Sequence, residues 1–351
     1  MAYTRRDFIR SSSSAMAGLV TVPLASQLIP PSTATANPSA ARLAAVLADE
    51  ANGKASIDRK AEANKIGFPI VDTHTHFYDP TRPEGVPWPA KNDPVLYRPV
   101  LPREFESLTK PFGVTGTIIV EASPWLEDNQ WLLDLATDHP FVLGIVGNLS
   151  PGTARFAKDL ARFSRNSLYR GIRIGSSQVK AGLDRPEFLM DLQRLVDADL
   201  ELDVNGGPET LMLVDRLAGR IPELRIVINH LSNIKIDGKQ PPAEWLGELK
   251  AAASHSQVYL KVSALIESAR TDAKKAPQAT EFYHPVLQEA WQAFGEDKLI
   301  YGSNWPVSEL AGPYELVLQI VTDFFQDQSR GAREKFFAKN ASIAYAWKPR
   351  R

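Results

Sequence analysis

Short apolar runs rich in β-branched residues alternate with helix-length amphipathic segments along most of this chain. Eight runs have the pattern of strands, at 69–74, 116–121, 142–148, 169–174, 200–205, 225–230, 258–263 and 298–303. Eight helical patterns lie between or after them, at 102–110, 126–138, 153–163, 185–197, 208–218, 243–254, 281–294 and 313–325. Strands that alternate with helices of this length indicate βαβ units and a parallel sheet. Eight such units in about 280 residues predict an α/β protein with a (β/α)8 TIM barrel.

A doubly wound open sheet is the alternative architecture. It is disfavoured because no glycine-rich phosphate-binding loop follows the first strand. The last two helical patterns, at 332–338 and 341–347, are expected to pack beneath or beside the barrel. No second break in composition follows residue 67, so we expect residues 67–349 to form one barrel domain.

The N-terminal region has the features of an export signal. Arg5 and Arg6 precede an apolar Phe-Ile step, a modestly apolar segment follows at 15–28, and small residues before position 37 offer a cleavage site. We therefore expect a twin-arginine signal peptide over 1–36, recognised by the twin-arginine export machinery, and a periplasmic or exported protein. A basic tail or an uncleaved anchor is the alternative. The apolar residues are too interrupted to predict a transmembrane helix, so no stable membrane insertion is expected after cleavage. Residues 37–66 are predicted to be a linker or helix.

The composition excludes several kinds of chemistry. The chain of 351 residues contains no cysteine, which rules out disulfides, thiol nucleophiles and thiolate metal ligands. Its formal net charge of −1 gives no electrostatic footprint for nucleic acid. A small-molecule substrate is therefore the expected partner.

Polar side chains end nearly all of the predicted strands, where a barrel of this kind carries its active site. His74 and His76 are two residues apart in the first strand and therefore face the same side. Two imidazoles at one point can bind a metal, orient a substrate oxygen or relay a proton. A third histidine, His230, ends the sixth strand. The other strand ends carry Glu121, Asn148, Arg173, Asp203, Asn205, Lys261, Ser263, Ser303 and Asn304.

Two charged residues within apolar strands have alternative roles. An unpaired buried guanidinium is costly, so Arg173 either binds a substrate carboxylate or hydroxyl pair or forms an ion pair with Glu121 or Asp203. Lys261 faces either the barrel interior or the surrounding helices. It shares a strand face with Ser263, which slightly favours the interior.

The eighth strand ends at Asn304, whose amide donates and accepts hydrogen bonds but takes no proton at neutral pH. Trp305 next to it either forms a wall of the substrate pocket or packs in the core. The candidate substrate-binding residues are Glu121, Arg173, Asp203, Lys261 and Trp305.

An ordered set of motifs resembles the amidohydrolase-related (metal-dependent hydrolase) family. The motifs are Asp-Thr-His-Thr-His at 72–76, Gly-Ile-Arg at 171–173, Ile-Asn-His-Leu at 228–231, Leu-Lys-Val-Ser at 260–263 and Tyr-Gly-Ser-Asn-Trp-Pro-Val at 301–307. Their order and spacing look most like the sugar-lactonase branch, which includes L-fuconolactonase and 2-pyrone-4,6-dicarboxylate lactonase. The resemblance covers residues 67–346.

The resemblance implies a barrel that hydrolyses a carboxylic ester, most often a lactone of a sugar acid, by attack of water. By this similarity His74, His76 and His230 would polarise the substrate carbonyl, directly or as ligands of a divalent metal such as zinc. The chain lacks the family's fifth-strand histidine, and a metal-free site is therefore favoured. The candidate catalytic residues are His74, His76, His230 and Asn304.

The family normally has an aspartate where Asn304 stands, and that aspartate acts as general base or metal ligand. An amide cannot be a general base. Glu121, Asp203 or His76 would then have to take the proton. Alternatively, the barrel is catalytically altered or inactive and binds a small molecule without hydrolysing it. A metal-dependent decarboxylase, a reaction also found in the wider superfamily, is a third hypothesis.

Overall fold

The computed structural model describes residues 66–270 and 275–348. The predicted signal peptide and nearly all of the predicted linker lie outside the described residues, so both stay predictions. Within the described residues, eight parallel strands pair in sequence order and form a nearly closed barrel, as the sequence predicted. The strands are β1 (Ile70–Thr75), β2 (Val114–Val120), β3 (Val142–Gly147), β4 (Tyr169–Gly175), β5 (Glu201–Asn205), β6 (Ile226–Ile228), β7 (Val258–Val262) and β8 (Leu299–Tyr301).

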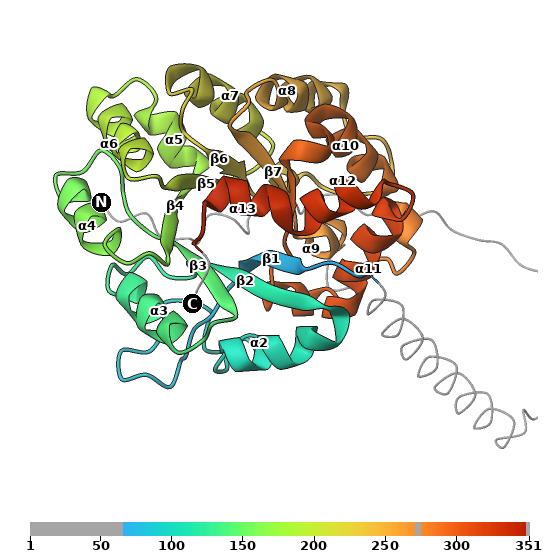
Figure 1. Cartoon of the computed structure of the whole chain (residues 1–351), viewed down its shortest axis with the longest axis horizontal. Coiled ribbons are helices and arrows are strands. Elements are labelled where there is room, and N and C mark those ends of the chain that lie inside the picture. The colour runs from blue at the N-terminus through green and yellow to red at the C-terminus, as the bar shows by residue number, and fades with distance from the viewer. Residues whose placement is uncertain (1–65, 271–274, 349–351) are drawn as a thin grey trace, which may run out of the picture. The chain divides into compact units, whose positions relative to one another are not determined.

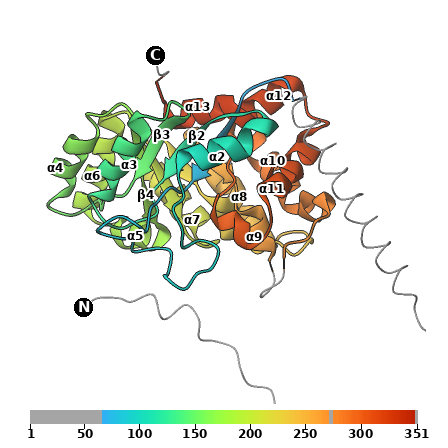
Figure 2. The same ribbon diagram turned by 90° about the horizontal axis from the view of Figure 1, so that it is seen from below.

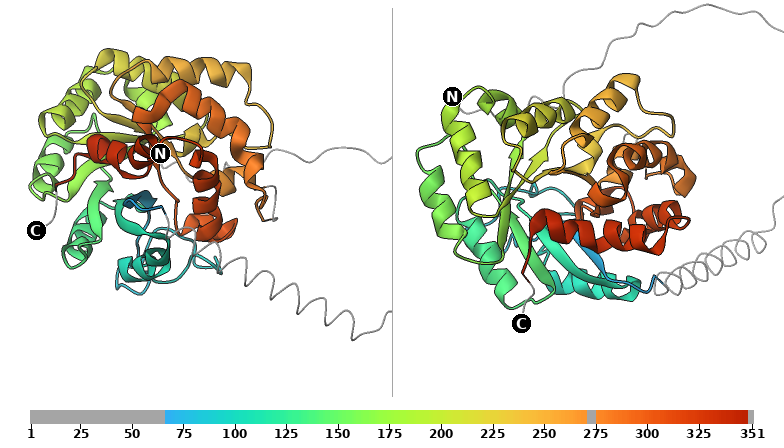
Figure 3. Two further views of the ribbon diagram at one scale, coloured as in Figure 1. Left: turned by 45° about the vertical axis from the view of Figure 1, so that its right-hand side comes forward. Right: turned by 45° about the horizontal axis from the view of Figure 1, so that its top comes forward.

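Helices form a ring around this sheet (Figures 1 and 3). The helices that follow the strands on the outside are α2 (Pro102–Thr109), α3 (Asp128–Thr137), α4 (Phe156–Phe163), α6 (Pro186–Asp197), α7 (Thr210–Arg220), α8 (Ala243–Ala253), α10 (His284–Lys298) and α11 (Tyr314–Phe325). Two helices that the sequence patterns did not predict are α5 (Ser176–Gly182) and α9 (Leu265–Ala269). They have seven and five residues, which is too short for a helical period to show in the sequence.

The barrel closes at the strand ends between β1 and β8. The backbone N–H of Asn304 donates to the carbonyl of His74 at 2.9 Å, and the N–H of His76 donates to the carbonyl of Trp305, also at 2.9 Å. Because these bonds join the two strands at their carboxyl ends, they fix His74, His76 and Asn304 relative to one another.

The last helices are α12 (Arg330–Glu334) and α13 (Asn340–Tyr345), joined by a π-helical turn at Lys335–Lys339. Ala341, Ala344 and Tyr345 of α13 pack against residues of the barrel interior such as Val146 and Tyr259. Figure 2 shows α13 at the opposite end of the barrel from α5 and α9. The last helical pattern therefore packs beneath the barrel, as predicted. No helix in the described part of the chain is long and apolar enough to cross a membrane.

Candidate active site

A cavity of about 390 Å³ opens at the carboxyl ends of the strands. Most of the residues in its wall are polar, and they come from the carboxyl ends of six strands or the segments that follow them. The lining residues are His76, Arg173, Asn205, His230, Asn233, Ala264, Glu267, Ser268, Asn304 and Val307. This is the face on which barrels of this class carry their chemistry.

The backbone around the cavity adopts left-handed conformations that residues other than glycine rarely use. His230–Asn233 form one left-handed turn with φ between 49° and 57°, Ala264 has φ 52° and Asn304 has φ 67°. The side-chain amide of Asn233 holds the first turn by donating to Asn205 Oδ1 at 3.0 Å and to the Gly206 carbonyl at 2.7 Å. Each such residue costs about 1 kcal/mol or more, and strain of this kind is concentrated at functional sites.

Three neutral histidines form the centre of the site. The ring of His74 lies 5.0 Å from that of His76 and 4.3 Å from that of His230, measured between centroids. Burial lowers the pKa of His76 to about 3 and holds the pKa values of His74 and His230 well below their usual range. His76 and His230 line the cavity, whereas His74 is fully buried beneath them.

The hydrogen-bond partners fix the tautomer of one of these histidines. His76 Nδ1 lies 2.9 Å from the Val120 carbonyl and its Nε2 lies 3.2 Å from Asn304 Oδ1, and because both oxygens can only accept, the single proton of the neutral ring serves one of them. Lys261 Nζ lies 2.8 Å from Asp203 Oδ2 and 3.2 Å from His74 Nδ1. Because the lysine ammonium can only donate, His74 keeps its proton on Nε2. That Nε2 is buried and has no partner among the described residues.

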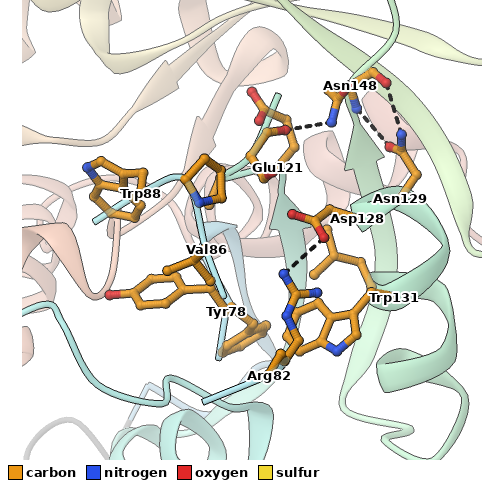
Figure 4. A pocket seen from close by; sticks show the side chains of 14 residues that line it. Tyr78, Arg82, Val86, Trp88, Glu121, Asp128, Asn129, Trp131 and Asn148 are labelled. Atoms are coloured by element: carbon orange, nitrogen blue, oxygen red, sulfur yellow. Dashed lines mark hydrogen bonds and ion pairs between the residues drawn. The ribbon is translucent and has the colours of Figure 1, made fainter. Parts of the chain in front are cut away.

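Arg173 lines the cavity and pairs with Glu121, one of the alternatives that the sequence left open. Its Nε donates to Glu121 Oε1 at 2.8 Å and its Nη2 donates to the Glu121 carbonyl at 2.6 Å. Glu121 also borders a small side pocket that contains the Arg82–Asp128 ion pair (Figure 4). The side pocket has about 10 Å³ of free space, enough for one water molecule and too little for a substrate.

Of the five predicted substrate-binding residues only Arg173 lines the cavity, whereas Glu121, Asp203, Lys261 and Trp305 do not. Asp203 is fully buried and is held by Lys261 and by the hydroxyl of Tyr345 at 3.0 Å. Trp305 is also fully buried, with its ring centroid 5.0 Å from that of Phe105. The structure thus gives Trp305 the packing role and Asp203 the role of an ion-pair partner in the interior.

Glu267 lines the cavity, but the sequence analysis did not identify it. Its Oε1 accepts a hydrogen bond of 2.8 Å from Asn304 Nδ2, while its Oε2 is buried without a partner among the described residues. Burial raises the pKa of Glu267 to about 7. The signal that the sequence offers for Glu267 is its position five residues after the end of β7, on the active-site face of the barrel, but a search confined to the strand ends does not reach it.

The residues present do not fit a metal ion. Within residues 66–270 and 275–348, no group of three or more His, Asp or Glu side chains is arranged to hold one. The bond from Lys261 leaves a proton on His74 Nε2, so at most two histidines of the lining, His76 and His230, could offer a nitrogen lone pair to a cation. A closed zinc site normally has four ligands and a catalytic one has three.

Residues 71–346 match the family model for amidohydrolases. The chain belongs to the amidohydrolase family. It is 31% identical over 246 residues to an L-fucono-1,5-lactonase of Burkholderia ambifaria, an alignment that covers 70% of this chain and 82% of that relative. A second L-fucono-1,5-lactonase, from Burkholderia multivorans, is 27% identical over 80% of this chain and 97% of its own length.

Solved structures agree with this assignment. An amidohydrolase of Burkholderia multivorans with bound zinc superposes with a TM-score of 0.72 at 25% identity, covering 80% of this chain and 99% of that one. A probable 2-pyrone-4,6-dicarboxylic acid hydrolase of Acinetobacter baumannii shares the fold, with a TM-score of 0.61 at 17% identity over 79% of this chain and 99% of that one. The family predicted from the motifs, and a lactonase-like hydrolase within it, are confirmed.

Proposed function

We propose that this amidohydrolase hydrolyses the lactone of a sugar acid, a small carboxylic ester, by attack of water on the carbonyl. The observation that carries the proposal is the polar cavity at the strand ends, which combines buried neutral histidines with hydrogen-bonding side chains suited to a hydroxylated ring. The 31% identity to an L-fucono-1,5-lactonase supports the same reaction.

The charges around the cavity favour a neutral, polyhydroxylated substrate. Arg173 is the one cationic side chain in the described lining, and Glu121 already neutralises it. A dicarboxylate would need further cations to replace its hydration. Asn205 and Asn233 are hydrogen-bonded to each other, which leaves an amide donor on one and an amide oxygen on the other for neighbouring hydroxyl groups.

The histidines would polarise the carbonyl through hydrogen bonds. His74 Nε2 carries a proton that has no partner among the described residues, and it lies beneath the two lining histidines, so a carbonyl oxygen that entered between the rings of His76 and His230 would accept it. Negative charge grows on that oxygen when water attacks. A donor already fixed in a site that excludes water stabilises this charge, and removal of one such donor typically lowers kcat about 100- to 1000-fold.

Acid release from a panel of lactones tests the proposal. We expect turnover of L-fucono-1,5-lactone and related aldonolactones, and little or none of 2-pyrone-4,6-dicarboxylate. His230→Gln should lower kcat at least 100-fold, whereas His255→Gln should not, because His255 pairs with Asp215 outside the cavity lining. Absence of turnover on every lactone, with and without added zinc, would contradict the proposal.

Asn304 favours a second candidate, a barrel that binds a sugar lactone or acid without hydrolysing it. An amide at this position cannot accept the proton of the attacking water. Calorimetric titration with the aldonic acid distinguishes the two candidates. Tight binding without turnover supports the binding protein, and turnover excludes it.

A further inference from the structure

The cavity needs a group that accepts the proton of the attacking water, and the three candidates from the sequence are engaged elsewhere. Glu121 is paired with Arg173 through its side chain and its backbone carbonyl. Asp203 is fully buried against Lys261 and does not reach the cavity. His76 Nε2 lies 3.2 Å from Asn304 Oδ1, and burial lowers the pKa of His76 to about 3, which makes its ring a weak proton acceptor at neutral pH.

Glu267 is the carboxyl group in the described lining that is free of a cationic partner. Glu267 lies five residues after the end of β7, on the short helix α9. One of its carboxyl oxygens accepts a hydrogen bond from Asn304 Nδ2 at 2.8 Å. Its other oxygen has no partner in the described part of the chain. A carboxylate held through one oxygen, with the second unengaged, keeps lone pairs for a proton, and Glu267 lies in the cavity wall.

We propose that Glu267 is the general base of this enzyme and that Asn304 is the residue that positions it. The inference rests on the proposed lactone hydrolysis and identifies the proton acceptor that replaces the aspartate expected at position 304. In this proposal the amide of Asn304 orients the Glu267 carboxylate, and Glu267 accepts the proton that the aspartate of the family would accept.

The proton and bond changes balance without any further reactant. Water oxygen forms a bond to the carbonyl carbon as one of its protons passes to the Glu267 carboxylate. The tetrahedral intermediate then collapses, the bond between the carbonyl carbon and the ring oxygen breaks, and Glu267 returns the proton to the ring oxygen. The product is the open hydroxy acid, which ionises to the carboxylate at neutral pH.

An amide at position 304 suits a glutamate base better than a carboxylate would. Asn304 Nδ2 donates to ionised Glu267 and so favours the form that accepts a proton. An aspartate in the same place would face Glu267 at 2.8 Å with a second negative charge, and the two carboxyls would share a proton. Burial raises the pKa of Glu267 to about 7, close to the value that is most effective for a general base at neutral pH.

The first experiment measures kcat and KM against pH for the lactone that the wild type hydrolyses. We expect kcat/KM to rise with one ionisation near pH 7, and Glu267→Gln to lower kcat at least 100-fold with KM changed less than about threefold. The matched control Glu244→Gln, on the exposed side of α8, should behave as the wild type. In Asn304→Ala the rise of kcat/KM, which is the acid limb of the profile, should move to higher pH, because the Glu267 carboxylate loses the hydrogen bond from the Asn304 amide and its pKa increases.

A Glu267→Gln enzyme that keeps at least a third of the wild-type kcat with the same acid limb would overturn the proposal. So would an unmoved limb in Asn304→Ala together with wild-type kcat. Circular dichroism and melting temperature of each variant separate loss of the base from loss of the fold.

A second experiment needs no substrate and therefore separates failure of this inference from failure of the proposed function. Protein labelled with ¹³C at the glutamate carboxyl carbon is titrated by NMR, and the signal absent from Glu267→Gln is assigned to Glu267. Titration near pH 7 is expected. Titration near the ordinary glutamate value overturns the inference, even if lactones are hydrolysed. If no lactone is hydrolysed, the proposed function and this inference fall together, whatever the titration shows.

Discussion

At the scale of single residues, Glu267 shows how a site can gain reactivity at the expense of stability. Its carboxyl group is held where its charged form is disfavoured, and the pKa rises to about 7 as a result. Folding therefore favours the protonated form. The stabilisation that this contributes is complete below the unfolded pKa and is lost as the pH rises through the folded pKa.

The raised pKa of Glu267 predicts how the stability of Glu267→Gln compares with that of the wild type at different pH values. Glutamine carries no charge at any pH, so the variant should unfold with about the wild-type free energy at pH 4, below the unfolded pKa, and be more stable at pH 8 by on the order of 3 kcal/mol. Urea unfolding followed by tryptophan fluorescence at both pH values measures the difference. The prediction is wrong if the difference in free energy of unfolding between variant and wild type is the same, or zero, at both pH values. The buried histidines titrate identically in the two proteins and cancel from the comparison.

The sequence identified polar and ionisable residues at the strand ends. The structure places four of them, His76, His230, Arg173 and Asn304, around one cavity. Glu267 could not be found in this way. Its role depends on the contact between the short helix α9 and Asn304 after β8, and no local pattern encodes that contact. Trp305 was ambiguous for a similar reason, because a backbone φ of 67° at Asn304 decides where the chain turns next.

At the scale of secondary structure, alternating apolar runs were enough to predict every strand and the helices of the outer ring. The predicted fifth strand at 200–205, for example, forms as β5. The short α5 and α9 were missed because tertiary packing, not helical periodicity, stabilises segments of this length. The left-handed turn at His230–Asn233 was also invisible, since its residues are not the glycines that normally indicate such a backbone.

Gly171 tests the packing between neighbouring strands. A Cβ there would lie 2.0 Å from Glu201 Oε1 and 2.6 Å from the Glu201 backbone carbonyl on β5, which cannot move without breaking the sheet. We expect Gly171→Ala to lower the free energy of unfolding by about 2 kcal/mol or more. Thermal melting of purified protein measures the effect.

The matched control is Gly247→Ala on the exposed face of α8, where an added Cβ has no neighbour within 4 Å. Alanine favours the helix and restricts the unfolded chain, so this variant should be more stable than the wild type by about 0.5–1 kcal/mol. If Gly171→Ala melts at or above the wild-type temperature, the strand contact described here does not exclude a methyl group.

At the scale of the whole molecule, a buried polar chain connects the two ends of the barrel. The hydroxyl of Tyr345, on α13 beneath the barrel, donates to Asp203 Oδ1 at 3.0 Å. Asp203 Oδ2 accepts from Lys261, which in turn donates to His74 beneath the cavity. Asp203 and Lys261 are completely excluded from solvent, so each group in the chain depends on its neighbours for its hydrogen bonds.

Tyr345→Phe removes the hydrogen bond to Asp203, which lies at the end of this series of hydrogen bonds that is remote from the cavity. It leaves Asp203 Oδ1 buried without its donor, which should lower the free energy of unfolding by about 1–3 kcal/mol. The lysine still bonds to Asp203 Oδ2 and to His74, so kcat/KM at 25 °C should stay within about threefold of the wild type. Ile343→Ala, an exposed change on the same helix, is the control and should alter neither quantity. A large fall in kcat for Tyr345→Phe at unchanged stability would show instead that α13 controls the tautomer of His74 directly.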